Sequence, residues 1–217
     1  MITFEVDGRH VTVQPGISVL QACLEHDIFI PNLCWLENMT RPPASCRLCF
    51  VQVEGRPRPQ TSCTLEVQEG MVVRTDTQEV RELQRTALEM LLSVHDLNCK
   101  ECPAHKDCEL QRIAKFLKVG LKPKFLPLLG SNKERDSSHP CLMYNPGRCV
   151  LCGRCVHICG QKGQVQILSF AHRGIQTVVS FFGAWETEAG NCFSCQACVQ
   201  ACPVSALTLK VSPAVEA

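Results

Sequence analysis

The sequence contains the stretch Cys149-Val-Leu-Cys152-Gly-Arg-Cys155-Val-His-Ile-Cys159, and its spacing returns in Cys192-Phe-Ser-Cys195-Gln-Ala-Cys198-Val-Gln-Ala-Cys202. Both stretches follow the pattern C-x₂-C-x₂-C-x₃-C, and Pro203 follows the second one. Three thiolates at this spacing let one tight loop surround three corners of a compact inorganic core, so the fourth corner is filled from elsewhere in the chain. The repeat therefore predicts a module that holds two 4Fe–4S clusters and depends on them for folding.

The two stretches resemble the ligand runs of two-cluster bacterial ferredoxins, in which the fourth cysteine of each run binds the other run's cluster. This resemblance implies two crossed ligand sets, namely Cys149, Cys152, Cys155 and Cys202 for one cluster, and Cys159, Cys192, Cys195 and Cys198 for the other. Gly160 follows the first run in place of the proline of the strict signature. A pair of zinc sites is the alternative, although zinc ligands usually form C-x₂-C pairs separated by a longer loop.

Composition indicates a soluble, metal-rich protein. The 217 residues include 17 cysteines, and the N-terminal residues 1–7 are neither basic nor followed by the apolar stretch of a signal peptide. No apolar stretch reaches the roughly 18 residues that suggest a membrane span. So many thiols without an export signal favour a reducing cytoplasm. The chain has a net charge of +1, which four bound clusters would shift to about −6, and this charge disfavours a nucleic-acid partner.

A second group of cysteines follows the pattern C-x₁₁-C-x₂-C-x₁₃-C and comprises Cys34, Cys46, Cys49 and Cys63. The surrounding sequence predicts a hairpin over 2–13 with an Asp7-Gly8 turn, a helix over 17–27, and strands over 50–54 and 71–75. This order resembles the β-grasp fold of 2Fe–2S ferredoxins, in the variant found at the head of complex I and iron hydrogenase chains. A zinc site is the alternative, because four cysteines with one C-x₂-C also suit zinc.

A third group begins at the end of a predicted amphipathic helix over 77–97, whose expected apolar side comprises Val80, Leu83, Ala87, Met90, Leu91 and Val94. The pattern H-x₃-C-x₂-C-x₅-C then comprises His95, Cys99, Cys102 and Cys108. The three cysteines need a fourth ligand, and spacing leaves both His95 and His105 open. Resemblance to the His-Cys₃ cluster site of the complex I family favours His95, although a Cys₃His zinc site would have the same pattern.

The remaining segments complete a predicted α+β fold in four parts. Residues 1–76 form the β-grasp 2Fe–2S ferredoxin module, 77–119 a small helical His-Cys₃ module, 120–140 a linker, and 141–217 a two-cluster bacterial ferredoxin-like module. Further predictions are a helix from Glu109 with Leu110, Ile113, Phe116 and Leu117 on one face, a strand or hairpin over 172–182 and a closing strand over 204–209. Cys23 is expected to pack as a small hydrophobic residue, and Cys141 is read as structural, with a redox or partner role as its alternative.

The order of the modules resembles the N-terminal region of the complex I large iron–sulfur subunit, of iron-only hydrogenases and of NAD-dependent formate dehydrogenases. It is also similar to the small diaphorase subunit of bidirectional NAD-reducing nickel–iron hydrogenases. The likeness covers nearly the whole chain and includes the segments Asn32-Leu33-Cys34, Cys46-Arg-Leu-Cys49, Glu101-Cys-Pro, Cys108-Glu-Leu-Gln, Ser138-His-Pro and Arg148-Cys-Val-Leu-Cys-Gly-Arg-Cys.

The resemblance implies a non-catalytic subunit that relays single electrons through one 2Fe–2S and three 4Fe–4S clusters. Its expected partners are a flavin- and NAD-binding subunit and a catalytic subunit, most simply a hydrogenase, with a formate dehydrogenase or another reductase as the alternative. The sequence contains no G-x-G-x-x-G fingerprint, no P-loop and no convincing nucleophile–base set. A truncated iron hydrogenase is opposed by the absence of further cysteine motifs, and a zinc-based interaction module is the alternative from another class.

Overall fold

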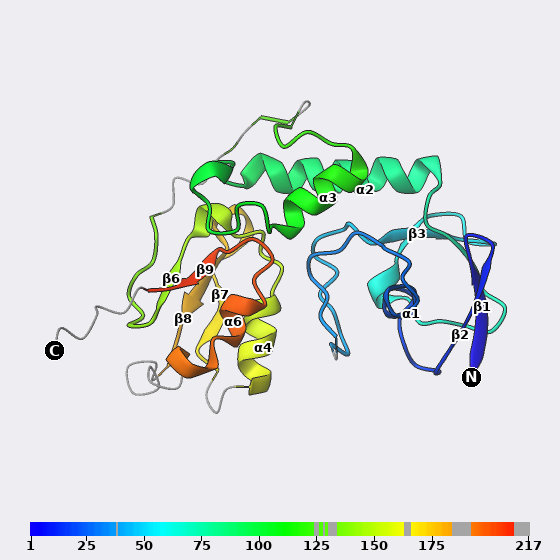
Figure 1. The fold of residues 1–217 in the computed structure, drawn as a ribbon, viewed down its shortest axis with the longest axis horizontal. Coiled ribbons are helices and arrows are strands. Elements are labelled where there is room, and N and C mark those ends of the chain that lie inside the picture. The colour runs from blue at the N-terminus through cyan, green and yellow to red at the C-terminus, as the bar shows by residue number, and fades with distance from the viewer. Residues whose placement is uncertain are drawn as a thin grey trace. The chain divides into compact units, whose positions relative to one another are not determined.

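The computed structural model describes residues 1–37, 39–123, 126–127, 129, 134–162, 166–183 and 192–210. Helices and short strands are mixed throughout, and the chain divides into two compact units (Figure 1). The first unit comprises Met1–Leu92 and Arg112–Pro127, and the second comprises Ser93–Gln111 and Leu128–Ala217. Residues 124, 125, 128 and 130–133 of the predicted linker over 120–140 lie outside the described residues. Within the described ranges, every helix is too short or too polar to cross a membrane.

The first unit contains a five-stranded sheet in the order β2-β1-β5-β3-β4. Strands β1 (Ile2–Val6) and β2 (Arg9–Val13) form the predicted hairpin. Asp7 and Gly8 both have positive φ, at 48° and 84°, which is the two-residue turn that matches the twist of a hairpin. Strand β5 (Val72–Arg74) runs parallel to β1 and antiparallel to β3 (Phe50–Val53), and the short β4 (Gln60–Thr61) completes the edge.

Helix α1 (Val19–Glu25) packs its apolar side into the core of this unit. Ser18 begins the helix because its hydroxyl accepts a hydrogen bond from the Gln21 N–H at 3.2 Å. Cys23 is fully buried among the valines and leucines of the core, and burial raises the pKa of its thiol to about 12. The prediction that Cys23 packs as a small hydrophobic residue is therefore confirmed.

Helix α2 (Gln78–Val94) lies where the sequence predicts a helix; of the predicted apolar side, Val80 and Ala87 are buried and Leu83, Leu91 and Val94 are half-buried. The buried side comprises Val80, Gln84, Ala87, Leu88 and Leu92, whereas Met90 is 60% exposed. Gln84 replaces the expected apolar contact because its side-chain amide donates a hydrogen bond to the Phe50 carbonyl at 3.0 Å. The predicted apolar side was wrong at Met90, which is exposed, and it missed Gln84, which is buried. Helical periodicity counts apolar residues only, so it does not predict a glutamine that is buried because it is hydrogen-bonded.

Helix α3 (Glu109–Leu117) buries Leu110, Ile113 and Leu117, as the sequence predicts. Phe116 is 38% exposed, so it does not belong to the fully buried side of the helix. Its ring instead meets the Phe29 ring edge-to-face at 4.9 Å, and the Arg81 guanidinium lies 4.7 Å from the ring centre. The division between the two units falls within α2 and α3.

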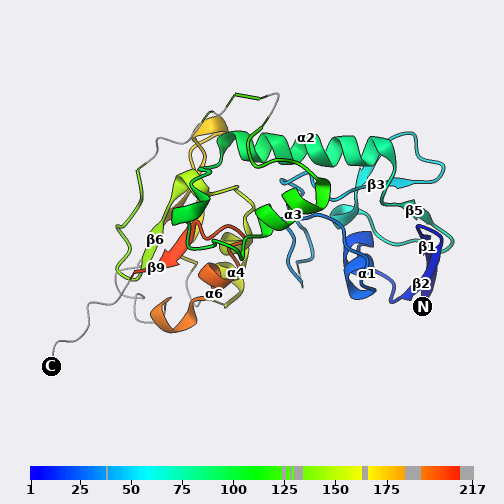
Figure 2. The same ribbon diagram turned by 45° about the horizontal axis from the view of Figure 1, so that its top comes forward.

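The second unit contains two small antiparallel sheets. Strand β6 (Leu142–Tyr144) pairs with β9 (Leu207–Leu209), and β7 (Leu168–Ala171) pairs with β8 (Val178–Phe181). The predicted closing strand is confirmed, and the strand or hairpin predicted over 172–182 corresponds to β8, whose partner β7 begins earlier, at Leu168. Helices α4 (Arg154–Lys162) and α6 (Ala197–Gln200) lie side by side in both views (Figure 2). Helix α4 contains the third and fourth cysteines of the first repeat, and α6 contains the third cysteine of the second.

Candidate metal centres

The first group of cysteines lies inside the core of the first unit. Cys34, Cys46, Cys49 and Cys63 are between 1% and 4% exposed. Cys49 lies just before β3, and Cys63 lies in the one-turn helix η1 (Ser62–Thr64). Ser62 holds these two segments together, because its backbone N–H and its hydroxyl both donate hydrogen bonds to the Cys49 carbonyl, at 2.9 and 2.8 Å. The two segments are thereby joined beside the cysteine side chains.

The four thiols associate in two pairs, and each pair contains one thiol with a lowered pKa and one with a raised pKa. The Cys34 and Cys46 sulfurs lie 3.4 Å apart, and their hydrogen bond lowers the pKa of Cys34 to about 6 while it raises that of Cys46. A hydrogen bond from Cys63 likewise lowers the pKa of Cys49, and the pKa of Cys63 is raised. Four buried thiolates repel one another, so a bound cation is needed to ionise them together.

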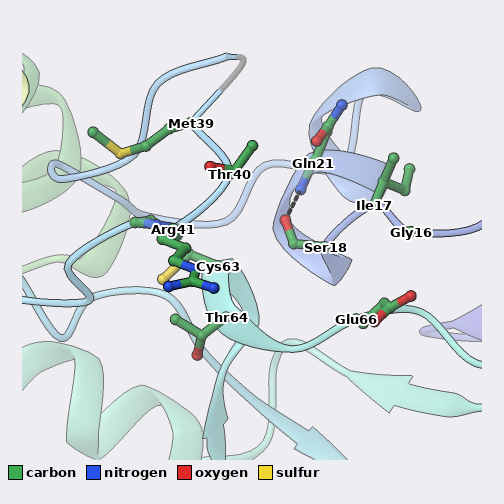
Figure 3. Close-up of a pocket in the computed structure, with 11 residues that line it drawn as sticks. Gly16, Ile17, Ser18, Gln21, Met39, Thr40, Arg41, Cys63, Thr64 and Glu66 are labelled. Carbon is green, nitrogen blue, oxygen red and sulfur yellow. Dashed lines mark hydrogen bonds between the residues drawn. The ribbon is translucent and has the colours of Figure 1, made fainter. Parts of the chain in front are cut away.

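A pocket of about 560 Å³ adjoins one side of this group (Figure 3). Its wall includes Cys63 together with polar side chains from two loops and from the start of α1, among them Ser18, Thr40, Arg41 and Glu66. Cys63 itself is only 2% exposed. The pocket therefore brings open space close to the Cys63 side of the cysteine group.

The third group lies in the second unit, at the end of α2. His95 is 7% exposed, and its Nδ1 atom is buried with no hydrogen-bond partner in the described part of the chain. Burial is the main cause that lowers the pKa of His95 to about 4, so the imidazole is neutral near pH 7. His105 is exposed. The charges of Cys102 and Cys99 add to the effect of burial and raise the pKa of Cys108, which indicates that the three thiols are near one another.

The last cysteine of each repeat lies near cysteines of the other repeat. The thiols whose charges raise the pKa of Cys152 are those of Cys149 and Cys202. For Cys198, in contrast, the contributing thiols are Cys159, Cys192 and Cys195. The pKa of Cys155 is raised, after burial, by the charges of Cys152, Cys149 and Cys202 and then, more weakly, by that of Cys198. Cys202 therefore lies near the first three cysteines of the other repeat, and Cys159 lies near those of the second.

Charged side chains connect the third group to the first repeat. Arg154 lies between Cys152 and Cys155 in sequence, and its guanidinium makes a two-pronged ion pair with Glu109, the residue after Cys108, at 3.0 and 3.2 Å. Arg148 precedes Cys149 and donates a hydrogen bond to the Glu101 carbonyl at 3.3 Å. Sequence reasoning missed these two buried arginines, although their positions beside cysteines were a signal.

Backbone groups also join these segments. The Asp96 N–H donates to the Gly147 carbonyl at 2.7 Å, and the Glu109 N–H donates to the Pro203 carbonyl at 3.2 Å. Among the residues that the structure describes, no three His, Cys, Asp or Glu side chains converge as they would around a single metal ion. The thiols are nevertheless grouped in sets whose mutual charge needs a cationic core.

Three known domain families match successive parts of the chain. A 2Fe-2S iron-sulfur cluster binding domain matches residues 1–78, the NADH-ubiquinone oxidoreductase-G iron-sulfur binding region matches residues 84–121, and a 4Fe-4S dicluster domain matches residues 148–206. Their order is the order of the three cysteine groups described above. The chain therefore contains both 2Fe–2S and 4Fe–4S ferredoxin-type domains.

The chain is similar in sequence to much longer curated proteins. A G subunit of NADH-quinone oxidoreductase from Rhizobium meliloti, the one numbered 2, is 34% identical over 95% of this chain and 24% of that protein. The HndD subunit of the NADP-reducing hydrogenase of Solidesulfovibrio fructosivorans is 35% identical over 95% of this chain and 36% of that protein. The chain thus spans about a quarter to a third of the length of these relatives.

A solved structure extends the likeness to the whole fold. A chain in the crystal structure of an NAD⁺-reducing [NiFe]-hydrogenase in the H₂-reduced state is 33% identical, with a TM-score of 0.84. The match covers 97% of this chain and 88% of that one. Together with the order of the domains, this match shows that the chain belongs to the family of iron–sulfur electron-transfer subunits related to NAD(P)-reducing hydrogenases and to the G subunits of NADH-quinone oxidoreductases.

Proposed function

We propose that the chain relays single electrons through one 2Fe–2S cluster and three 4Fe–4S clusters. The observation that carries this proposal is the grouping of its cysteines into sets too close together to be ionised without a cationic core. The proposed ligands are Cys34, Cys46, Cys49 and Cys63 for the 2Fe–2S cluster, His95, Cys99, Cys102 and Cys108 for one 4Fe–4S cluster, Cys149, Cys152, Cys155 and Cys202 for the second, and Cys159, Cys192, Cys195 and Cys198 for the third.

The pairing of thiols supports the 2Fe–2S assignment. Each iron of such a cluster takes two cysteine ligands. Cys34 and Cys46 already form a hydrogen-bonded pair, and Cys63 has the largest effect on the lowered pKa of Cys49. These pairs are the natural ligands of the two irons, and their burial would keep the cluster away from bulk water.

The state of the two histidines supports His95 as the non-cysteine ligand. A metal ligand must be a neutral imidazole with a free ring nitrogen. His95 is buried and neutral, with an unpaired Nδ1 among the described residues, whereas His105 is exposed to water. A ligand role for His95 would also explain why this buried nitrogen has no hydrogen-bond partner there.

We further propose the finer architecture that these ligand sets imply. Residues 1–76 form a β-grasp 2Fe–2S ferredoxin module, 77–119 a His-Cys₃ module, 120–140 a linker, and 141–217 a two-cluster ferredoxin-like module. The sheet order β2-β1-β5-β3-β4 with α1 packed into its core supports the first assignment. The grouping of Cys202 with the first repeat, and of Cys159 with the second, supports the last.

We propose two kinds of partner for this relay. One is a flavin-containing subunit that exchanges hydride with NAD(H), and the other is a catalytic subunit, most simply a hydrogenase. The names of the hydrogenase relatives support this assignment. Another reductase is the second candidate for the catalytic side, because the alpha subunit of the NADPH-Fe(3+) oxidoreductase of Geobacter sulfurreducens is 32% identical over 97% of this chain.

Metal analysis of anaerobically purified protein tests the proposal directly. The expected content is about 14 iron atoms per chain with matching acid-labile sulfide and a brown colour. Stoichiometric zinc in a colourless protein would instead support the zinc-based interaction module. A content of about four iron atoms would contradict the number of clusters but not the class of function.

A further inference from the structure

Arg148 is a buried cation in the second unit. The residue is 7% exposed, and it ends the one-turn helix η3 (Pro146–Arg148), directly before Cys149. Its Nη2 atom donates a hydrogen bond to the Glu101 carbonyl at 3.3 Å. Its Nε atom is buried and has no hydrogen-bond partner among the residues that the structure describes. The described protein groups therefore satisfy this guanidinium only in part.

No carboxylate forms an ion pair with Arg148 in the described part of the chain. The ion pairs found there belong to Arg74, Arg81 and Arg154. Arg154, the other buried arginine of this unit, has its charge balanced by Glu109. A buried charge without a counter-charge is strongly unfavourable in free energy. The surroundings of Arg148 therefore favour the presence of an anion.

Two hydrogen bonds hold Arg148 against the segments of the His-Cys₃ group. Glu101, whose carbonyl accepts from the guanidinium, lies between the first two cysteines of that group. Gly147, the residue before Arg148, accepts a hydrogen bond at 2.7 Å from the N–H of Asp96, the residue after His95. Burial is the main cause that lowers the pKa of His95, and the positive charge of Arg148 adds to it. The unbalanced cation is thus next to one proposed cluster site.

We propose that Arg148 is the internal counter-cation of the cluster held by His95, Cys99, Cys102 and Cys108, and that it raises the reduction potential of this cluster. The inference rests on the proposed function, because it requires that ligand set. Reduction adds one electron to the cluster and makes it more negative. A positive charge held nearby, away from bulk water, therefore stabilises the reduced form more than the oxidised form.

Redox titration of the cluster-loaded protein with dithionite, followed by electron paramagnetic resonance, tests the inference. The signal of this cluster is the one that His95→Ala removes or alters. Arg148→Gln and Arg148→Met remove the charge, and each should lower the equilibrium constant for one-electron reduction about tenfold, which corresponds to about 59 mV. Arg148→Lys keeps the charge but not the planar fork, and it should return the constant toward the wild-type value.

Arg173→Gln is the matched control. It also removes one positive charge from the second unit, but Arg173 is exposed. At about 1 M salt, where exposed charges are screened within about 3 Å, this control should leave the potential of the cluster unchanged. The effect of the buried Arg148 should persist under the same conditions, because mobile ions do not reach it.

The outcomes separate a charge effect from a structural one. Wild-type potentials in Arg148→Gln and Arg148→Met would overturn the inference. Loss of the cluster from Arg148→Lys as well as from the neutral variants would also overturn it, since the shape of the guanidinium would then be required. Loss from the neutral variants alone, with a near-wild-type potential in Arg148→Lys, would support it. Wild-type protein without a 4Fe–4S signal that depends on His95 would overturn the proposed ligand set itself.

Discussion

The two cysteine repeats have the same spacing, yet they lie in different surroundings. In the first repeat, Cys152 and Cys155 are 7% and 8% exposed, whereas Cys195 in the second repeat is exposed to water. Arg148 lies directly before the first repeat and Arg154 lies within it, and both side chains are buried. Helix α4 in the first repeat has nine residues, and α6 in the second has four. Equal spacing therefore predicts equal ligand number but not equal environment.

The difference matters because a cluster's potential depends on hydrogen bonds, local charge and access to water. Burial raises the pKa of Cys152 and of Cys198 to about 12, so both sites need a cationic core to hold thiolates. In the first repeat, the charge of the buried Arg154 lowers the pKa of Cys152. Among the described residues, no arginine acts in this way on Cys198 of the second repeat. We expect the two clusters to differ in potential although their ligands are identical in kind.

The largest effect is expected from a variant that breaks the proposed exchange of ligands between the repeats. Cys202→Ala should lose about four of about 14 iron atoms, because three thiolates do not hold a 4Fe–4S cluster firmly. Its paramagnetic resonance spectrum should match that of Cys152→Ala, which lies in the first repeat. A match to Cys195→Ala, which lies in the same repeat as Cys202, would show that each repeat binds its own cluster.

The next largest effect is expected at the His-Cys₃ group, which Arg148 and Arg154 connect to the first repeat. His95→Ala should remove or strongly alter one cluster signal, since it deletes a proposed ligand from a buried site. His105→Ala should leave every cluster signal unchanged because His105 is exposed. The opposite result in resonance spectra of the two variants would make His105 the ligand.

A smaller effect is expected from the ion pair beside the first repeat. Glu109→Gln leaves the Arg154 guanidinium buried without its carboxylate, and the side chain of Arg154 is 8% exposed against 32% for Glu109. We expect a loss of about 1–3 kcal/mol, less than for a fully buried pair because water reaches Glu109. The measurement is the urea concentration at which cluster absorbance is lost.

Two variants control the ion-pair experiment. Glu101→Gln changes an exposed carboxylate in the same segment and should have little effect. Adding Arg154→Met to Glu109→Gln should restore part of the stability, since the buried charge that lost the Glu109 carboxylate is then removed. An equal effect of Glu101→Gln and Glu109→Gln would contradict a stabilising role for the pair.

The smallest effect concerns His139, which lies three residues before β6 and has no counterpart in the second repeat. Its Nδ1 accepts hydrogen bonds from the Cys141 and Leu142 N–H groups, at 3.1 and 3.2 Å, and burial together with the charge of Lys210 lowers the pKa of the imidazole. The unfolded state, with a pKa of about 6.5, therefore binds a proton that the folded state does not. Stability due to this group is present above about pH 6.5 and decreases as the pH falls below it.

His139→Asn keeps an acceptor oxygen near the position of Nδ1 but does not titrate. Relative to wild type, the variant should gain stability as the pH falls from 7 to 5.5, by at most about 1.4 kcal/mol per pH unit. Thermal loss of cluster absorbance at several pH values measures this difference. His10→Asn on the exposed side of β2 controls for the loss of a histidine, and an equal pH trend in both variants would contradict the assignment.

Much of the local structure was predictable because it depends on short-range rules. The Asp7-Gly8 turn needs two positive φ angles, and the Ser18 cap satisfies a free N–H at the start of α1, so both are readable from a few residues. The buried side of α2 was not readable in this way. Gln84 is buried there because the Phe50 carbonyl, distant in sequence, needs a hydrogen-bond donor.

Cysteine spacing alone sufficed to predict the iron–sulfur domains, because cluster ligands must follow one another at short, regular intervals to surround a small core. The surroundings of those ligands depended on the fold. The ion pair of Arg154 with Glu109 and the hydrogen bond from Arg148 to the Glu101 carbonyl join residues that are distant in sequence. Burial, charge and hydrogen bonding around a cluster are set by which segments meet in space, and no motif records which segments those are.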